Sequence, residues 1–307
     1  MAQAILAQAQ CTSSPSPTPR MLQPRQTFEG QYLAFPIYLC IASIANSVFL
    51  YRSLNDLRTA ATGTVSQAGS QVLVCAAIAE LIWVVPCFVQ CAIYVAAKNN
   101  NETGQAACDI QGFYSLTSSV GSMFVGALVS WFTLEQLVVS SERSLGSWKW
   151  AGAACLLTAV ILGIIPAIPG VRDNAGYTAL GEGFCYWDLT ADGPAVVMLL
   201  LTVTLMGITF VLNCKSVRAL HLQDEVDYKA EKYTITAALV MSYFFTWILW
   251  PVASLFTLSD QSFPSGLMIA GGILGHAQAL VNPLLYGWAW KRYFLEGRTA
   301  VTVKQVS

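Results

Sequence analysis

Long apolar blocks alternate with short polar segments along the 307 residues of the chain. Each block holds about 20 residues or more, which is enough for a helix to cross roughly 30 Å of hydrocarbon. The blocks are apolar on all faces, whereas strands of a membrane β-barrel alternate between apolar and polar positions. The pattern therefore predicts an all-α membrane protein, a seven-transmembrane helix bundle. The predicted spans are 33–52, 71–96, 111–139, 149–168, 194–214, 234–257 and 266–289.

The composition agrees with a chain that lies in membrane lipid. Hydrophobic residues make up 55% of it and charged residues 11%, whereas a soluble domain carries about a quarter charged residues. So few charges cannot cover the surface of a soluble domain. The net charge of -1 provides no basic field that would attract nucleic acid.

Lysine and arginine predict the orientation, because both are enriched in cytoplasmic loops. If the N-terminus lies outside, the predicted inner loops and C-terminal tail hold twelve of the 16 Lys and Arg residues. The outer segments then hold only Arg20, Arg25, Lys98 and Arg172. We therefore expect a multi-pass protein of the plasma membrane with its N-terminus outside.

Two further features fall on the predicted outer side. Asn101-Glu102-Thr103 is a sequon for glycosylation of Asn101, in the first outer loop. Cys108 and Cys185 fall in the first and second outer loops, on the side where disulfides persist. A disulfide between them is the prediction, and two unrelated free thiols are the alternative.

The two ends of the chain differ from the apolar blocks. Residues 1–32 contain SSPSPTPR and no continuous apolar run, so we expect a disordered extracellular tail. Residues 33–290 form the predicted seven-transmembrane domain. Residues 291–307 are expected to form a short cytoplasmic helix and a tail.

The last apolar block contains the stretch NPLLY, from Asn282 to Tyr286. Pro283 removes a backbone hydrogen bond and loosens the helix, while Asn282 and Tyr286 supply polar groups. The stretch resembles the NPxxY motif of rhodopsin-like G protein-coupled receptors. Lys291-Arg292-Tyr293-Phe294 resembles the start of their short amphipathic eighth helix. An ordinary proline kink followed by a basic anchor is the alternative.

Two residues in earlier blocks strengthen this resemblance. Asn46 resembles the first-helix asparagine of the family, and Glu80 stands where the family usually has aspartate. A carboxylate inside a membrane helix is costly and therefore marks a functional hypothesis. We expect Asn46 and Asn282 to be the partners of Glu80, through water or a cation, in a conformational switch. A helix-packing hydrogen bond with no switching role is the alternative.

Glu142-Arg143 resembles the Glu/Asp-Arg-Tyr motif of the third helix, with Ser144 in place of tyrosine. Arg143 follows Cys108 by 35 positions, farther than in the family. Either Cys108 lies outside the helix, or Arg143 lies in the following loop. In the second case Glu135 is the expected acidic residue.

The sixth block departs from the family pattern FxxCWxP. Pro251 is present, but Leu249 stands where tryptophan is expected and Trp250 lies beside it. We predict that the helix swings about Pro251. The resemblance places an extracellular ligand between helices three, five, six and seven, and the candidate ligand-binding residues are Tyr114, Trp247, Trp250 and His276.

Other branches share parts of this pattern. The runs ERSLG and FCYW resemble prostanoid receptors, but their seventh-helix arginine has no match in 266–290. The long third helix and CYW resemble the slime-mould cyclic AMP receptors, which lack NPxxY. A covalently bound retinal needs a lysine in the seventh helix, and none occurs there. The prediction is a divergent rhodopsin-like receptor that signals to a heterotrimeric G protein, with a cyclic AMP receptor-like protein as an alternative.

Functions other than signalling have less support in the sequence. The chain has two histidines and no HExxH or GxSxG motif, so we expect neither an enzyme nor a bound metal or cofactor. A small-solute or proton-coupled transporter that uses Glu80 and Glu135 is the main alternative. No internal repeat typical of transporters is apparent.

Overall fold

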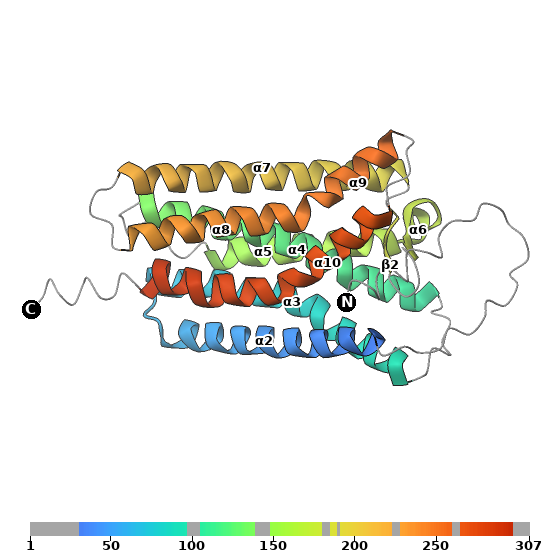
Figure 1. Cartoon of the computed structure of the whole chain (residues 1–307), viewed down its shortest axis with the longest axis horizontal. Coiled ribbons are helices and arrows are strands. Elements are labelled where there is room, and N and C mark those ends of the chain that lie inside the picture. The colour runs from blue at the N-terminus through green and yellow to red at the C-terminus, as the bar shows by residue number, and fades with distance from the viewer. Residues whose placement is uncertain are drawn as a thin grey trace, which may run out of the picture.

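The structure is a computed structural model that describes residues 31–96, 105–138, 148–179, 185–188, 191–222, 228–259 and 265–296. Long helices run side by side along the longest axis of the molecule (Figure 1). One end carries a two-stranded β-hairpin, and we call it the hairpin end. The opposite end carries the last helical segment, η3 (Leu285–Glu296), and we call it the η3 end.

The described residues include six helical segments that are long and apolar enough to cross a membrane. They confirm a largely helical, multi-pass membrane protein. Their bounds are Pro36–Thr59, Val65–Ile93, Ala106–Leu137, Trp148–Ala167, Asp192–Leu222 and Lys229–Leu258. The seventh predicted block corresponds to α10 (Ser265–Leu284), which is not among these six. The seventh crossing therefore stays a prediction.

The surface of the bundle is apolar, as expected for helices in lipid. On α2 (Gln31–Thr59), Ile37, Ile41 and Ile44 recur at helical spacing, and 59%, 54% and 60% of their surface is exposed. Asn46 and Ser53 of the same helix are buried. A soluble helix has the opposite distribution, so the packing supports a bundle immersed in membrane lipid.

Helix α4 (Gln105–Val138) lies at the centre of the bundle. It packs against α3 (Val65–Ala96), α5 (Trp148–Ile164) and α7 (Asp192–Leu222). At 34 residues it extends about 50 Å, because an α-helix rises 1.5 Å per residue. This length allows α4 to contribute side chains at both ends of the bundle.

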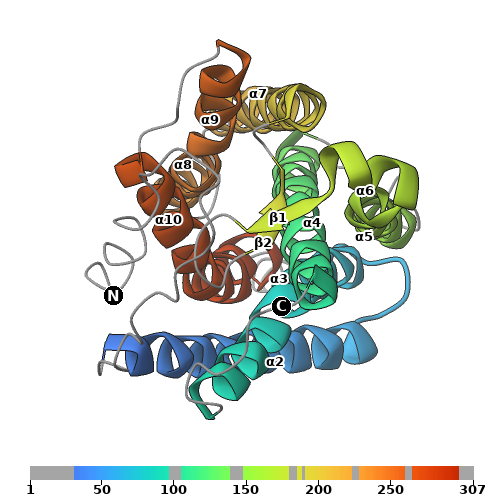
Figure 2. The ribbon, with the colours of Figure 1, turned by 90° about the vertical axis from the view of Figure 1, so that its right-hand side faces the viewer.

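The hairpin lies over the centre of the bundle when it is viewed from the hairpin end (Figure 2). Strand β1 (Tyr177–Ala179) pairs antiparallel with β2 (Cys185–Trp187), with Thr178 opposite Tyr186. Both strands pack on α4. A short 3₁₀ turn, η2 (Ile165–Ala167), and the short helix α6 (Pro169–Ala175) connect α5 to the hairpin.

The predicted sixth helix is divided in two. One residue, Ile248, separates helix α8 (Lys229–Trp247) from α9 (Leu249–Leu258). Helix α9 turns away from the axis of α8 (Figure 1). Pro251 has no N–H to donate to the carbonyl of Trp247, four residues earlier. The break therefore falls where the proline removes a helical hydrogen bond.

The seventh block ends differently from the sequence prediction. Helix α10 passes directly into η3, a π-helix that contains Tyr286 and the Lys291–Phe294 run. Trp290 and Phe294 of η3 are buried, because the helix continues through the bundle instead of turning onto its surface. Within the described residues, the predicted eighth helix is not a separate element.

The structure decides in part how the third predicted helix lies relative to Cys108 and to the Glu142-Arg143 motif. Cys108 lies in the first turn of α4, so the alternative that places it outside the helix is wrong. The helix ends at Val138, and Glu142 and Arg143 lie outside the described residues. Asn101 and residues 1–30 of the predicted tail also lie outside them.

Candidate functional site: a buried carboxylate and two proline sites

Among the described residues, Glu80 of α3 has a buried carboxylate at the centre of the bundle. Its Oε1 accepts hydrogen bonds from Ser122 Oγ at 2.9 Å, Gln278 Nε2 at 3.0 Å and Asn282 Nδ2 at 2.7 Å. These donors lie on α4 and α10, so one oxygen atom joins three helices. We call Glu80, Ser122, Gln278 and Asn282 the Glu80 cluster.

Asn282, one predicted partner of Glu80, donates to it directly, whereas Asn46, the other predicted partner, does not. A link between Asn46 and Glu80 through water or a cation stays a prediction. Asn46 Nδ2 donates instead to the carbonyls of Ala42 at 2.9 Å and Ala279 at 2.7 Å. Ala279 lies four residues before Pro283, which has no N–H to donate to that carbonyl. Asn46 thus supplies the hydrogen bond that the proline removes, and it joins α2 to α10.

Two tyrosines meet α4 at Gly126, on the η3 side of the Glu80 cluster. Tyr243 of α8 donates a hydrogen bond from its hydroxyl to the Met123 carbonyl at 3.0 Å. A Cβ atom at Gly126 would come within 2.5 Å of the Tyr243 ring and 3.8 Å of the Tyr286 hydroxyl. The missing side chain at Gly126 therefore lets the Tyr243 ring pack against the backbone of α4, and the Tyr286 hydroxyl lies beside the same position.

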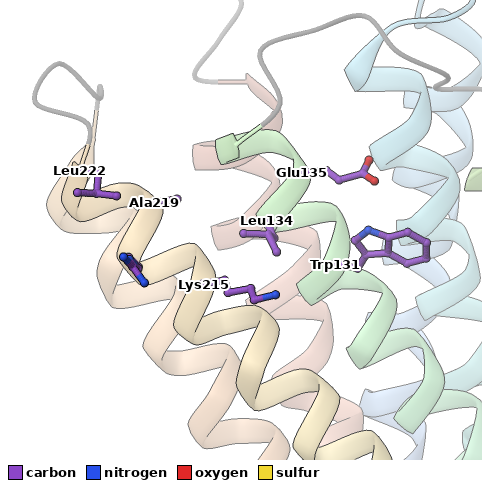
Figure 3. A pocket seen from close by; sticks show the side chains of 7 residues that line it. Trp131, Leu134, Glu135, Lys215, Ala219 and Leu222 are labelled. Atoms are coloured by element: carbon purple, nitrogen blue, oxygen red, sulfur yellow. The ribbon is translucent and has the colours of Figure 1, made fainter.

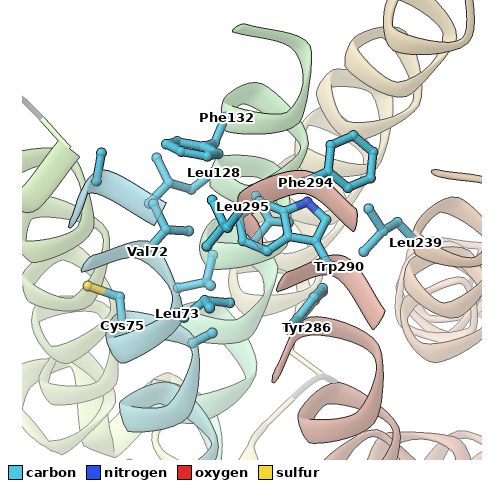
Figure 4. Close-up of a cluster of buried hydrophobic side chains, with 14 of the residues drawn as sticks. Val72, Leu73, Cys75, Leu128, Phe132, Leu239, Tyr286, Trp290, Phe294 and Leu295 are labelled. Atoms are coloured by element: carbon cyan, nitrogen blue, oxygen red, sulfur yellow. The ribbon is translucent and has the colours of Figure 1, made fainter. Parts of the chain in front are cut away.

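The η3 end is closed by an apolar cluster around Trp290 (Figure 4). The Trp290 ring lies 5.6 Å from that of Phe132, and its Nε1 donates to Thr133 Oγ1 at 2.8 Å. Phe294 packs in the same cluster. Nearby, Asn213 of α7 donates to Ser130 Oγ of α4 at 2.8 Å. Helices α4, α7 and η3 are therefore held together at this end.

The hairpin end is closed by aromatic side chains that we call the hairpin aromatic cluster. It comprises Tyr177, Tyr186, Trp187, Trp247 and Trp250, all packed in one apolar group. The Tyr186 ring stacks on the Trp250 ring with centroids 4.7 Å apart. The Trp250 indole N–H is buried and has no hydrogen-bond partner in the described part of the chain.

The phenols of this cluster stay neutral over a wide pH range. Burial raises the pKa of Tyr186 above its ordinary value. Burial, together with the nearby Tyr186 and Asp109, raises the pKa of Tyr177. The Tyr177 hydroxyl donates to the Gly163 carbonyl, and its ring packs against Gly112, where a Cβ atom would collide with it. The hairpin is thereby attached to α4 and α5.

The four predicted ligand-binding residues lie in two groups. Trp247 and Trp250 belong to the hairpin aromatic cluster. Tyr114 packs in a second cluster that contains Trp83, and the Trp83 ring meets the His276 ring edge-on at 4.6 Å. Tyr114 donates to Gln90 Oε1, and the His276 carbonyl accepts from the Tyr38 hydroxyl. Phe113 contacts both groups.

The predicted cysteine pair is described in part. Cys108 is disulfide-bonded, whereas the side chain of Cys185 lies outside the described residues. The backbone of Cys185 is in β2, which packs on the helix that carries Cys108. This arrangement supports the pairing of Cys108 with Cys185, which stays a prediction.

Glu135 does not belong to the Glu80 cluster. It lies in a groove between α4 and α7 near the η3 end, together with Lys215 and Arg218 (Figure 3). Glu80 and Glu135, the two carboxylates of the transporter alternative, therefore lie in different surroundings.

No protein-family model matches the chain, and no curated protein shows significant similarity to it.

Several residues of the site were not singled out from the sequence. Gln278 precedes Asn282 by four positions, so helical spacing places both on one face. This spacing is visible in the sequence and could have identified Gln278 as a partner of Glu80. Ser122 is one of several serines in α4, and the sequence did not distinguish it from the others. Tyr186 belongs to the CYW run, and nothing in the local sequence indicates that its ring is buried.

Proposed function

We propose that the chain is a G protein-coupled receptor of a divergent rhodopsin-like type, with its N-terminus outside the plasma membrane. An extracellular ligand binds at the hairpin end, and a heterotrimeric G protein binds at the η3 end. The observation that supports this most is the pair of contacts at the NPLLY stretch. Asn282 is bonded to the buried Glu80, and the carbonyl freed by Pro283 is bonded to Asn46.

These contacts suit a helix that must be stable in more than one arrangement. A proline inside a membrane helix lowers the cost of bending, and buried polar partners define discrete positions for the bent helix. Asn46, Glu80, Asn282 and Pro283 are therefore the proposed switch residues. An ordinary structural kink needs the bond to Asn46 but not the additional bond from Asn282 to a buried carboxylate.

The proposed mechanism links the two ends through helices six and seven. A ligand that contacts Trp250 or the hairpin binds one arrangement of α9 better, and it shifts the population toward that arrangement. The break at Ile248, three residues before Pro251, allows α8 to move relative to α9. Movement of α8 separates Tyr243 from the Met123 carbonyl, and Tyr286 and Trp290 then leave their buried positions. The η3 end opens to the G protein.

The test is proximity between the tagged full-length protein and each of a panel of Gα subunits in cell membranes. We expect basal coupling to one subunit, which Tyr286→Ala changes because Tyr286 is buried against α4. Tyr51→Ala is the matched control, since the Tyr51 side chain is exposed on α2. It should leave coupling unchanged.

Two results would contradict the proposal, provided that the protein reaches the cell surface. One is the absence of coupling to every subunit, and the other is equal coupling in wild type, Tyr286→Ala and Tyr51→Ala. Proton or solute flux that disappears in Glu80→Gln would favour the transporter alternative. A response to cyclic nucleotide with coupling unaffected by Tyr286→Ala would favour the cyclic AMP receptor-like alternative.

A further inference from the structure

A groove of about 410 Å³ opens on the side of the bundle between α4 and α7 (Figure 3). Helix α4 contributes Trp131, Leu134 and Glu135. Helix α7 contributes Lys215, Arg218, Ala219 and Leu222. The groove lies near the η3 ends of both helices and is separate from the Glu80 cluster and the hairpin aromatic cluster.

Three ionisable side chains share this groove, and together they carry one net positive charge. Lys215 and Arg218 are exposed and Glu135 is half-buried. In the described part of the chain, no ion pair joins Glu135 to Lys215 or Arg218. The groove therefore offers two cationic groups and one anionic group, which complement a ligand with two anionic groups and one cationic group.

An apolar stripe leads from the groove toward the middle of the membrane. Ile208 and Val211 are exposed on α7 and precede Lys215 by seven and four positions, so all three lie on one face of the helix. Trp131 of α4, which also lines the groove, exposes 48% of its surface, and its ring lies 5.3 Å from that of Trp148 on α5. A ligand with an acyl chain can lie along this stripe while its polar head occupies the groove.

The depth of the groove fits the headgroup region of a bilayer. Lys215 lies seven residues before the end of α7, which is about 10 Å along the helix. Basic side chains near helix ends often extend toward the membrane surface without any specific ligand. That explanation accounts for Lys215 and Arg218, but it does not account for the carboxylate of Glu135 in the same groove.

We propose that this groove binds one phospholipid whose headgroup carries a phosphate, a carboxylate and an ammonium group, the chemistry of phosphatidylserine. The phosphate and carboxylate face Lys215 and Arg218, whose guanidinium suits bidentate contact with either anion. The ammonium faces Glu135. The headgroup has one net negative charge and so complements the groove. Lipids of this type occur in the cytoplasmic leaflet, which is where the positive-inside orientation places the η3 end.

The experiment uses the purified full-length chain and native mass spectrometry, which counts bound lipids on each molecule. The chain is titrated separately with phosphatidylserine, phosphatidylglycerol and phosphatidylethanolamine. Wild type is expected to bind phosphatidylserine about fivefold better than either of the others, the size of a partly exposed ion-pair contribution. Phosphatidylglycerol lacks both the ammonium and the carboxylate, and phosphatidylethanolamine lacks the carboxylate.

The variants separate the two halves of the headgroup. Glu135→Gln should reduce the preference for phosphatidylserine over phosphatidylglycerol, because the contact with the ammonium is removed while the carboxylate still faces Lys215 and Arg218. Lys215→Gln combined with Arg218→Gln should weaken binding of both anionic lipids. Lys149→Gln is the control, since Lys149 lies over the Trp150 ring and does not line the groove. It should bind lipid as wild type does.

Equal binding of phosphatidylserine and phosphatidylglycerol to wild type would overturn the proposal and leave only general attraction of anionic lipid. An unchanged preference in Glu135→Gln would also overturn it. Melting temperatures confirm that each variant is folded, and Glu135→Gln alone decides the question if the double variant is unstable. The result does not depend on coupling to a G protein.

Discussion

The Glu80 cluster and the hairpin aromatic cluster both involve α4, but they join it to different elements and by different kinds of contact. In the Glu80 cluster, one carboxylate oxygen accepts three hydrogen bonds from two other helices. In the hairpin aromatic cluster, rings stack and pack with few directed bonds, and the buried Trp250 indole N–H has no hydrogen-bond partner among the described residues.

This difference predicts different responses to substitution. Loss of the acceptor in a buried polar cluster leaves several donors unsatisfied, and each one costs free energy. Ring contacts depend mainly on buried area, so a similar ring can replace another at small cost. The centre of the bundle should therefore tolerate little change, while the hairpin end can rearrange. A ligand site needs that capacity.

The largest effect is expected for Glu80→Leu. It leaves Ser122, Gln278 and Asn282 without their shared acceptor, which should lower the free energy of unfolding by at least about 3 kcal/mol. Thermal unfolding of the purified protein in detergent measures the change. Glu80→Gln is the matched control, because the amide keeps an acceptor oxygen at the same place. Equal melting temperatures for the Leu variant and wild type would refute the importance of the cluster.

The next largest effect is expected for Gly126→Ala. The added Cβ would meet the Tyr243 ring at 2.5 Å, and such overpacking costs about 2 kcal/mol. The same thermal assay should show a lower melting temperature. Gly207→Ala on α7 is the control, since nothing lies within 4 Å of a Cβ atom there. If both variants melt at the wild-type temperature, α4 and Tyr243 are not in close contact.

A moderate effect is expected for Asn46→Leu, which leaves the Ala279 carbonyl without a donor at a cost of about 1–2 kcal/mol. A double-mutant cycle with Pro283→Ala tests the cause. Alanine at 283 restores an N–H for that carbonyl, so Asn46→Leu should cost less in this background. Additive changes in the free energy of unfolding would show that Asn46 does not compensate for the proline.

The smallest effect is expected for Trp250→Phe in the hairpin aromatic cluster. Phenylalanine keeps the stack on Tyr186 and removes the unpaired indole N–H, so the net change should stay within about 1 kcal/mol. Trp250→Ala removes the ring and should cost more. A large loss of melting temperature in Trp250→Phe would show that the indole N–H has a partner and that the two clusters do not differ as described.

Local patterns predicted much of the fold and part of the site. The apolar blocks correspond to the helices, and Pro251 lies beside the break between α8 and α9, because a proline removes a hydrogen bond at a known offset. Asn282 is a partner of Glu80 as predicted, here through a direct hydrogen bond. A buried carboxylate needs hydrogen-bond donors, and the predicted helices contain few polar side chains that can donate. The ends of the helices were predicted less accurately. For example, α4 begins six residues before its predicted start at 111.

The sequence by itself determined that the chain is helical and lies in a membrane, because the length and apolarity of each block are local properties. It also determined which residues are too polar for lipid and must find partners inside the bundle. Only the tertiary structure decided which partners they find. Asn46 bonds to Ala279 and not to Glu80, Tyr186 is buried under Trp250, and Trp290 continues into the core. These contacts join residues far apart in the chain, and they depend on how the helices pack.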